Sequence, residues 1–246
     1  MTLTQEQAAQ VLGQIARHDR PTGTYNVPVS EHLQLPLRIS NGVFGSDIMS
    51  SGILLARYLH ANQNLFAGRR CLDMGCGPGT QGLLMAMLGA ADVDLADINP
   101  LAVADAGYNA RLSGLQDRVA CYESDLFDTL PNTRYECIVF NHPFFPERPE
   151  AMGQDPKGLG ASMLGGTDLI NRFLVDAKDH LEPRGVIVMP YFHFAGPKND
   201  PAAHAERFGY HVSKQEHIDS AEGLQRGDFS IYEIKRGQRT SKVEGE

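Results

Sequence analysis

Apolar residues follow two alternating patterns along most of the chain, and together the patterns predict the order of its strands and helices. Short, nearly continuous apolar runs are typical of strands buried in a parallel sheet, whereas apolar residues three and four apart mark one face of a helix. The runs predict strands at 70–74, 92–97, 119–122, 135–140 and 185–191. The periodic stretches predict helices at about 79–88 and 99–112, and another from Gly166 or Thr167 to about Leu181. Strands that alternate with helices favour an α/β fold, with a parallel sheet covered on both faces.

Segments of different character lie on either side of this alternation. After it, the pattern predicts a short helix at 202–208 and a closing pair of strands at 211–215 and 229–235, which brings the mostly parallel sheet to seven strands. The polar, charged residues 237–246 are expected to be a disordered tail. We therefore place the main domain at 50–236.

Residues 1–49 are expected to form an extension ahead of this domain. Thr4 to Gln7 match the S/T-x-x-E/Q capping box and predict a helix that runs to about Ala16. Prolines and glycines then divide the chain into turns and two possible edge strands, at 27–29 and 35–39. A further helix is predicted at 51–59. The extension could be a packing cover or a lid on the substrate side of a pocket, and the sequence leaves both open.

Composition narrows the class of protein. A chain of 246 residues that is 42% hydrophobic can bury a large core, and it holds no apolar stretch long enough to span a membrane. Residues 1–20 lack the apolar centre of a signal peptide, so a cytoplasmic location is expected. The net charge of −8 disfavours a large nucleic-acid-binding surface.

The cysteines and histidines do not predict a metal site. None of the four cysteines belongs to a C-x-x-C pair, and the nine histidines show no ligand spacing. All four cysteines lie on or beside predicted strands, so they are expected to be free thiols in a reducing compartment: Cys71, Cys76, Cys121 and Cys137.

The candidate chemistry begins at a glycine-rich turn between the first predicted strand and its helix. Gly75, Gly77 and Gly79 alternate with other residues, and glycine lets the backbone approach a ligand that a β-carbon would keep away. Asp73 stands two residues before the first of them, a place that suits the cationic end of a ligand. A second acid, Asp97, ends the next predicted strand 18 residues after Gly79, where carboxylates bind ribose hydroxyls in folds of this type.

An acid followed by G-x-G-x-G resembles the first motif of the class I S-adenosylmethionine-dependent methyltransferases, which are Rossmann-like. The run from Asp97 to Ala102 is similar to their second motif. The resemblance implies S-adenosylmethionine as cofactor, with Asp125 at the adenine amino group and Leu126 beside the ring. The implied cofactor-binding residues are Asp73, Gly75, Cys76, Gly77, Gly79, Asp97, Ile98, Asp125, Leu126 and Asn141.

The run from Asn141 to Phe144, at the end of the fourth predicted strand, resembles the (D/N/S)PP(Y/F/W) motif of methyltransferases that act on planar nitrogens. Such a nitrogen is a poor nucleophile because its lone pair is delocalised. The side-chain oxygen of Asn141 and the backbone carbonyl of residue 142 can accept its two N–H groups and stabilise the charge that develops during transfer. Phe144 can stack on the planar group. The chain departs from the motif at His142, which replaces the first proline and could act as a base or contribute only its carbonyl.

Four side chains are expected on the substrate side of the site: Phe44, Phe144, Phe145 and His193. Of these, His193 is a second candidate base. The loop Glu147–Gly165 is longer than most connections and could close as a lid, although it could also be disordered. Sequence alone leaves the oligomeric state open.

Two further stretches are similar to particular branches of that family. Residues 42–55 resemble ribosomal RNA guanine-amino and release-factor glutamine methyltransferases, and residues 164–170 resemble the glutamine enzymes. The chain is expected to lack the N-terminal helical domain of the glutamine enzymes and the duplicated domain of the guanine enzymes. This difference and the −8 charge favour a small-molecule acceptor; protein glutamine or RNA guanine is the alternative. A module that binds the cofactor without catalysis is the competing class.

Overall fold

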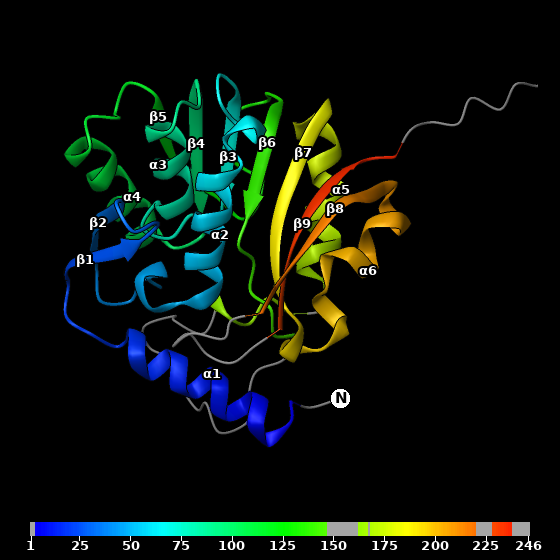
Figure 1. Ribbon diagram of the computed structural model, residues 1–246, viewed down its shortest axis with the longest axis horizontal. Coiled ribbons are helices and arrows are strands. Elements are labelled where there is room, and N and C mark those ends of the chain that lie inside the picture. Colours follow the sequence, from blue (N-terminus) through cyan, green and yellow to red (C-terminus); the bar gives the residue numbers. More distant parts are fainter. Residues whose placement is uncertain (1–2, 147–161, 167, 220–227, 238–246) are drawn as a thin grey trace, which may run out of the picture.

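Seven strands form one mixed sheet at the centre of the computed structural model, which describes residues 3–146, 162–166, 168–219 and 228–237 (Figure 1). The strands are β3 (Arg70–Met74), β4 (Asp92–Asp97), β5 (Val119–Glu123), β6 (Tyr135–Phe140), β7 (Leu181–Phe192), β8 (Tyr210–Asp219) and β9 (Asp228–Arg236). Their order across the sheet is β5-β4-β3-β6-β7-β9-β8, with β3 to β7 parallel and β9 antiparallel to both neighbours. The predicted Rossmann-like, mostly parallel sheet is confirmed.

Helices cover both faces of this sheet because each central strand is apolar on both sides. Cys71 and Leu72, neighbours on β3, belong to different clusters of buried residues. The first cluster packs under α2 (Ser50–Ala61), α3 (Thr80–Met87) and α4 (Pro100–Leu112). The second packs under α5 (Leu169–His180) and α6 (Pro201–Ala205), so each face has its own core.

Several boundaries differ from the prediction, and for two of them the contacts show why. Helix α5 begins at Leu169 and not at Gly166 or Thr167, because Gly166 has φ +70° and its carbonyl oxygen accepts a hydrogen bond from the side chain of Asn199. Strand β7 begins at Leu181, four residues early, because Leu181 pairs with Tyr135 across a register shift.

The extension forms a unit of its own beside α4. Helix α1 (Gln5–His18) begins with the predicted capping box at Thr4 and Gln7. The strands β1 (Gly23–Pro28) and β2 (Gln34–Ile39) pair with each other in a separate antiparallel hairpin, not with an edge of the large sheet. A 3₁₀ helix, η1 (Ser46–Ile48), leads from the hairpin into α2.

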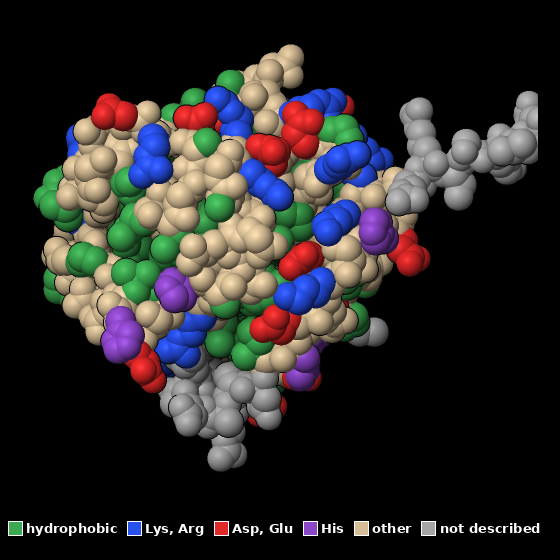
Figure 2. All heavy atoms as spheres, turned by 45° about the horizontal axis from the view of Figure 1, so that its top comes forward, with side chains coloured by type: hydrophobic (Ala, Val, Ile, Leu, Met, Phe, Trp, Pro, Cys, Tyr) green, Lys and Arg blue, Asp and Glu red, His purple; other side chains and the backbone are tan. Residues whose placement is uncertain are grey.

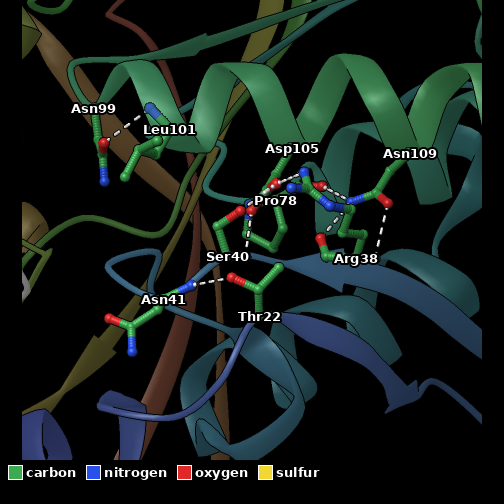
Figure 3. Close-up of polar contacts among 9 residues, drawn as sticks. All are labelled: Thr22, Arg38, Ser40, Asn41, Pro78, Asn99, Leu101, Asp105 and Asn109. Carbon is green, nitrogen blue, oxygen red and sulfur yellow. Dashed lines mark hydrogen bonds and ion pairs between the residues drawn. The ribbon is translucent and has the colours of Figure 1, made fainter.

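Buried polar side chains of α4 hold this hairpin in place (Figure 3). Asp105 accepts hydrogen bonds from the backbone N–H and hydroxyl of Ser40 and forms an ion pair with Arg38. Asn109 accepts the backbone N–H of Arg38 at 2.8 Å and donates to the carbonyl oxygens of Arg38 and Pro78. Since Pro78 lies in the glycine-rich turn, one side chain joins the hairpin to that turn.

Two of the predicted segments lie partly outside the described residues. The suggested lid, Glu147–Gly165, falls outside them over 147–161, as do residues 238–246 of the suggested tail. Among the described helices, none has both the length and the apolar character needed to cross a membrane. On the face drawn in Figure 2, basic and acidic side chains are interspersed.

Candidate functional site

A cavity of about 560 Å³ opens where the parallel strands β3, β4 and β6 end. Carboxyl ends of strands are the usual ligand-binding edge of such a sheet. Most of the residues predicted for the site line this cavity: Phe44, Gly75, Cys76, Gly77, Asp97, Ile98, Asp125, Leu126, Asn141, His142, Phe144 and Phe145. The fold therefore brings together residues that are far apart in the sequence.

The glycine-rich turn lines the cavity with backbone. Gly75 and Gly77 have φ of +62° and +54°, a conformation that other residues rarely adopt. A β-carbon on Gly77 would lie 3.3 Å from the carbonyl oxygen of Phe44, so the turn passes close to the extension. Gly79, with φ +92°, is the N-cap of helix α3 and is not among the described lining residues. Cys76 is buried, and its N–H donates to the carbonyl oxygen of Ala96.

Asp73 is oriented away from the cavity. Its Oδ2 accepts the backbone N–H of Gly82 in α3 at 2.7 Å, and it is not among the described lining residues. Burial raises the pKa of this carboxyl to about 7, although the hydrogen bond from Gly82 opposes the rise. The structure thus gives Asp73 a role in joining β3 to α3, and does not bring it to the ligand side as predicted.

Asp97 joins the turn to the next strand. Its Oδ2 accepts the N–H of Gly77 at 2.8 Å, and its Oδ1 accepts the N–H of Asn99 at 2.9 Å. Burial raises its pKa, and the backbone hydrogen bonds oppose this. The neighbouring Ile98 is 61% exposed at the rim of the cavity.

Asp125 and Leu126 line another part of the cavity, together with a residue that the sequence analysis missed. Leu126 has φ +52°, the one described non-glycine residue with positive φ. Arg172, on α5, donates to Asp125 Oδ2 at 2.8 Å and also lines the cavity. Its position in an amphipathic helix gave no signal, because the contact exists only once α5 packs beside the β5–β6 connection.

Asn141 follows β6 and lines the cavity. Its Oδ1 is buried and has no hydrogen-bond partner among the described residues. A buried acceptor without a partner is costly, so it marks a place where a ligand N–H could bind. The ring of Phe144, three residues after Asn141, lies edge-on to His142 and Tyr191.

His142 does not fit the predicted role as a base near neutral pH. The side chain is buried, and burial lowers its pKa to about 3, although contacts with the backbone of Asn199 and Phe140 oppose this. Its Nε2 lies 3.1 Å from the carbonyl oxygen of Asn199. A ring held neutral in this way does not titrate between pH 6 and 7.

The two remaining phenylalanines are held by different segments. Phe44 stacks on His18 of α1, with ring centroids 3.6 Å apart, so α1 supports one wall of the cavity. The N–H of Phe145 donates to the carbonyl oxygen of Met163, and the N–H of Gly165 donates to that of Phe145. Phe145 therefore ties the loop after β6 to the segment that leads into α5.

His193 is not brought to this site. Its Nε2 lies 2.8 Å from Ser230 Oγ of β9, its Nδ1 lies 3.9 Å from Asp200 Oδ2, and it is not among the described lining residues. The prediction that His193 contacts substrate is thus not supported, because the pairing of Phe192 with Phe229 sets the next residue against β9.

The cysteines fit their expected structural role. Each lies in the described part of the chain as a free thiol, buried or half-buried. Within the described residues, no three His, Cys, Asp or Glu side chains gather as metal ligands.

Comparisons with known proteins agree with this geometry. The family model of the methyltransferase small domain matches residues 34–155. The chain is 33% identical over 130 residues to a ribosomal protein uL3 glutamine methyltransferase of Bordetella pertussis, an alignment that covers 50% of this chain and 44% of that protein. It is 28% identical to a tRNA1(Val) (adenine(37)-N6)-methyltransferase of Phocaeicola vulgatus, with 71% and 70% covered. The chain spans about half the length of most of the curated relatives it matches.

Solved structures show the same fold at low identity. The 16S rRNA N2 G1207 methyltransferase of T. thermophilus, solved with AdoMet and guanosine, superposes with a TM-score of 0.62 at 19% identity, over 89% of this chain and 51% of that one. A ribosomal protein L11 methylase of Lactobacillus delbrueckii subsp. bulgaricus gives 0.61 at 17%, over 87% and 100%. In its matched domain and its curated relatives, the chain is similar to the S-adenosylmethionine-dependent methyltransferases, and it shares their fold.

Proposed function

We propose that the protein transfers a methyl group from S-adenosylmethionine to a planar amide or amino nitrogen, with the side-chain amide of a protein glutamine as the favoured acceptor. The observation that carries this proposal is the buried, unpartnered Oδ1 of Asn141 at the cavity. An acceptor in this position is suited to a substrate that brings an N–H group.

The residues present fit the cofactor. Gly75 and Gly77 expose backbone in a conformation that leaves room for a ligand, and Asp97 fixes the turn through the N–H of Gly77. We assign Asp97, Ile98, Asp125 and Leu126 to the nucleoside, with the glycine-rich turn at the methionine part. The cofactor supplies an electrophilic methyl group carried on a sulfonium. Asp73 and Gly79 support this site from behind, through α3.

The chain's own contribution to chemistry is to hold the acceptor nitrogen. Oδ1 of Asn141 accepts one N–H, and the backbone carbonyl of His142 accepts the other, which leaves the lone pair directed out of the amide plane. Both oxygens also stabilise the positive charge that develops on nitrogen, a larger effect in the transition state than in the ground state. Phe144 stacks against the plane of the amide or base and fixes its angle.

The relatives favour a macromolecular acceptor over the small molecule that the sequence analysis preferred. Several of those at about 30% identity are named as glutamine methyltransferases of ribosomal protein uL3 or of release factors. A small-molecule acceptor has no support among them. RNA adenine is the second candidate, because the tRNA adenine-N6 enzyme aligns over more of this chain than the glutamine enzymes do.

A direct assay separates these candidates. The purified protein is incubated with methyl-labelled S-adenosylmethionine and, separately, with a ribosomal protein and release-factor fraction, with bulk tRNA and with a small-molecule extract. Mass spectrometry of the digested products then looks for N5-methylglutamine or N6-methyladenine. We expect N5-methylglutamine in the protein arm.

Other outcomes assign other functions. N6-methyladenine alone would move the protein to the RNA branch, and label in the small-molecule arm alone would restore the original expectation. If calorimetry shows that the cofactor binds but no arm is methylated, the protein is a binding module and the proposal is wrong.

A further inference from the structure

We propose that His142 is a positioning residue whose imidazole fastens the loop carrying Asn141 to the backbone of Asn199. The inference rests on the proposed function, since the position of Asn141 matters for holding the acceptor nitrogen. The hydrogen bond from the imidazole replaces the rigidity that a proline gives this position in the family motif.

The hydrogen bond defines the state of the ring. Nε2 of His142 lies 3.1 Å from the carbonyl oxygen of Asn199, and a carbonyl oxygen can only accept. Nε2 therefore carries the hydrogen, and Nδ1 is the lone-pair nitrogen. Nδ1 is buried and has no hydrogen-bond partner among the described residues.

Aromatic rings enclose the imidazole. Tyr191 on β7 stacks on it, with centroids 5.8 Å apart and planes 6° apart. Phe144 meets it edge-on at 5.1 Å, and Phe140 lies tilted at 5.8 Å. These contacts fix the ring plane, so the one hydrogen bond can set the position of the loop backbone.

Asn199 also holds the other side of the loop. It lies in the 3₁₀ helix η6 (Pro197–Asn199) and is itself buried, and its Nδ2 donates to the carbonyl oxygen of Gly166 at 2.9 Å. Gly165, the preceding residue, donates to Phe145. The single residue Asn199 thus joins the start of the loop, through His142, to the segment where the chain returns to α5.

A proline at position 142 could not make these contacts. Proline restricts its own φ, but it would leave the carbonyl oxygen of Asn199 without a donor and leave space between the rings of Tyr191 and Phe144. In this chain, the restraint that a proline ring places on φ is replaced by a hydrogen bond to a residue 57 positions away. The same contacts argue against a proton-transfer role, because the nitrogen without a hydrogen is enclosed.

The first test reads the ring itself and needs no methyl acceptor. Two-bond ¹H–¹⁵N spectra of the histidine rings, with His142 assigned by its loss in His142→Gln, should show a neutral Nε2–H tautomer that does not change between pH 5 and 8. Titration of His142 with a pKa between 6 and 7, or an Nδ1–H tautomer, overturns the proposal. Because this result is independent of turnover, it stands even if the proposed function fails.

The second test compares two variants that differ in the donor. Gln can place its Nε2 where the imidazole Nε2 lies, whereas Phe keeps the ring and loses the donor. We expect the side-chain amide signals of Asn141 to stay in place in His142→Gln and to shift in His142→Phe. In the methylation assay, kcat of the Phe variant should fall about tenfold or more, with cofactor affinity within about threefold and most of kcat restored in the Gln variant.

Melting temperatures show whether each variant is folded. If the Phe variant does not fold, the Asn141 signals and the kcat of the Gln variant decide the test. Unshifted Asn141 signals and full kcat in the Phe variant would mean that ring packing alone suffices. An equal loss of kcat in both variants, with Asn141 unmoved, would mean that the imidazole acts on the reaction itself. Either result overturns the proposal.

Discussion

Asn141 and His142 are neighbours in the chain but have opposite hydrogen-bonding states. Oδ1 of Asn141 is buried with no partner among the described residues, whereas Nε2 of His142 pairs with the backbone of Asn199. Leaving a buried acceptor unpaired costs about 1–3 kcal/mol. That cost is recovered when a ligand N–H binds, so the asymmetry supports the proposal that Asn141 is the acceptor and His142 the positioning residue.

Replacing Asn141 with Ala should reduce kcat by about a hundredfold or more, because an acceptor that stabilises charge in the transition state is lost. The dissociation constant of S-adenosylmethionine should change by less than about threefold, since the proposed contact is with the acceptor nitrogen. Steady-state kinetics and calorimetry measure the two effects. Asn171→Ala is the matched control: its Oδ1 is also buried without a described partner, but it is not among the described lining residues. Near-normal turnover of the Asn141 variant would show that the methylated atom is not a nitrogen held in this way.

The buried carboxyl of Asp73 should make stability depend on pH. Its pKa is about 7 in the folded protein and about 4 in the unfolded chain, so folding favours the protonated form. Below about pH 4 the carboxyl is protonated in both the folded and the unfolded chain, and no stability is lost. As the pH rises from 4 to about 7, the carboxyl ionises more readily in the unfolded chain, so the folded protein loses stability progressively. In Asp73→Asn the amide oxygen can still accept the N–H of Gly82 and carries no charge. The variant should therefore gain stability over the parent protein as the pH rises from 4 to 7, by a few kcal/mol.

Urea unfolding at pH 4.5, 6 and 8 measures this difference. Asp92→Asn serves as the control, because Asp92 begins the neighbouring strand β4 at an exposed position. Curves that run parallel for the Asp73 variant and the parent would show that Asp73 is ionised in the folded protein throughout this range.

At the scale of helices and strands, the local sequence pattern predicted the bounds of those elements whose surroundings are the same along their whole length. β3, β4 and β6 have the predicted bounds because each contains apolar residues that are buried on both faces of the sheet. The start of α5 could not be predicted, because it is set by the contact between Gly166 and Asn199, 33 positions apart. The same holds for the pairing of β1 with β2 and for the ion pair between Arg172 and Asp125.

For the site too, some features could be predicted from the sequence and others could not. The residues predicted at strand ends line one cavity, because the carboxyl ends of parallel strands meet at one edge. The orientation of each side chain was not predictable. Asp73 faces α3, His193 faces β9, and His142 is enclosed by rings from several segments.

Asn109 shows how α4 couples the extension to the cofactor turn. Asn109→Ala removes hydrogen bonds to the backbones of Arg38 and Pro78 and leaves buried groups unpaired, each at about 1–3 kcal/mol. We expect a loss of about 2–4 kcal/mol in the free energy of unfolding and weaker cofactor binding, since Pro78 borders Gly77. Thermal and urea unfolding with calorimetry would measure both. Asn132→Ala, at an exposed position, should change neither, and an intact affinity in the Asn109 variant would show that the turn holds its shape without α4.

At the scale of the whole molecule, the extension is part of the cavity. Phe44 and Met49 line it, and Asn99 donates to the carbonyl oxygen of Gly42. Helix α1 lies at the end of the sheet toward which β6 points (Figure 1), with His18 stacked on Phe44. The matched family domain also begins at residue 34, inside the segment 1–49. These contacts favour a functional unit that starts before residue 50.

Two truncations test this division. Removing residues 1–20 takes away α1 and the ring that supports Phe44, but keeps the hairpin and its contacts with Asp105 and Asn109. This protein should fold with reduced stability and bind the cofactor within about tenfold of the full chain. Removing residues 1–49 takes Arg38 and Ser40 from the carboxylate of Asp105 on α4 and uncovers the buried cluster to which Leu35, Leu37 and Ile39 belong. We expect no cooperative unfolding transition and no cofactor binding for the shorter protein, as followed by circular dichroism and calorimetry. A stable 50–246 fragment that binds S-adenosylmethionine with normal affinity would establish residue 50 as the true domain boundary and reduce the extension to a cover.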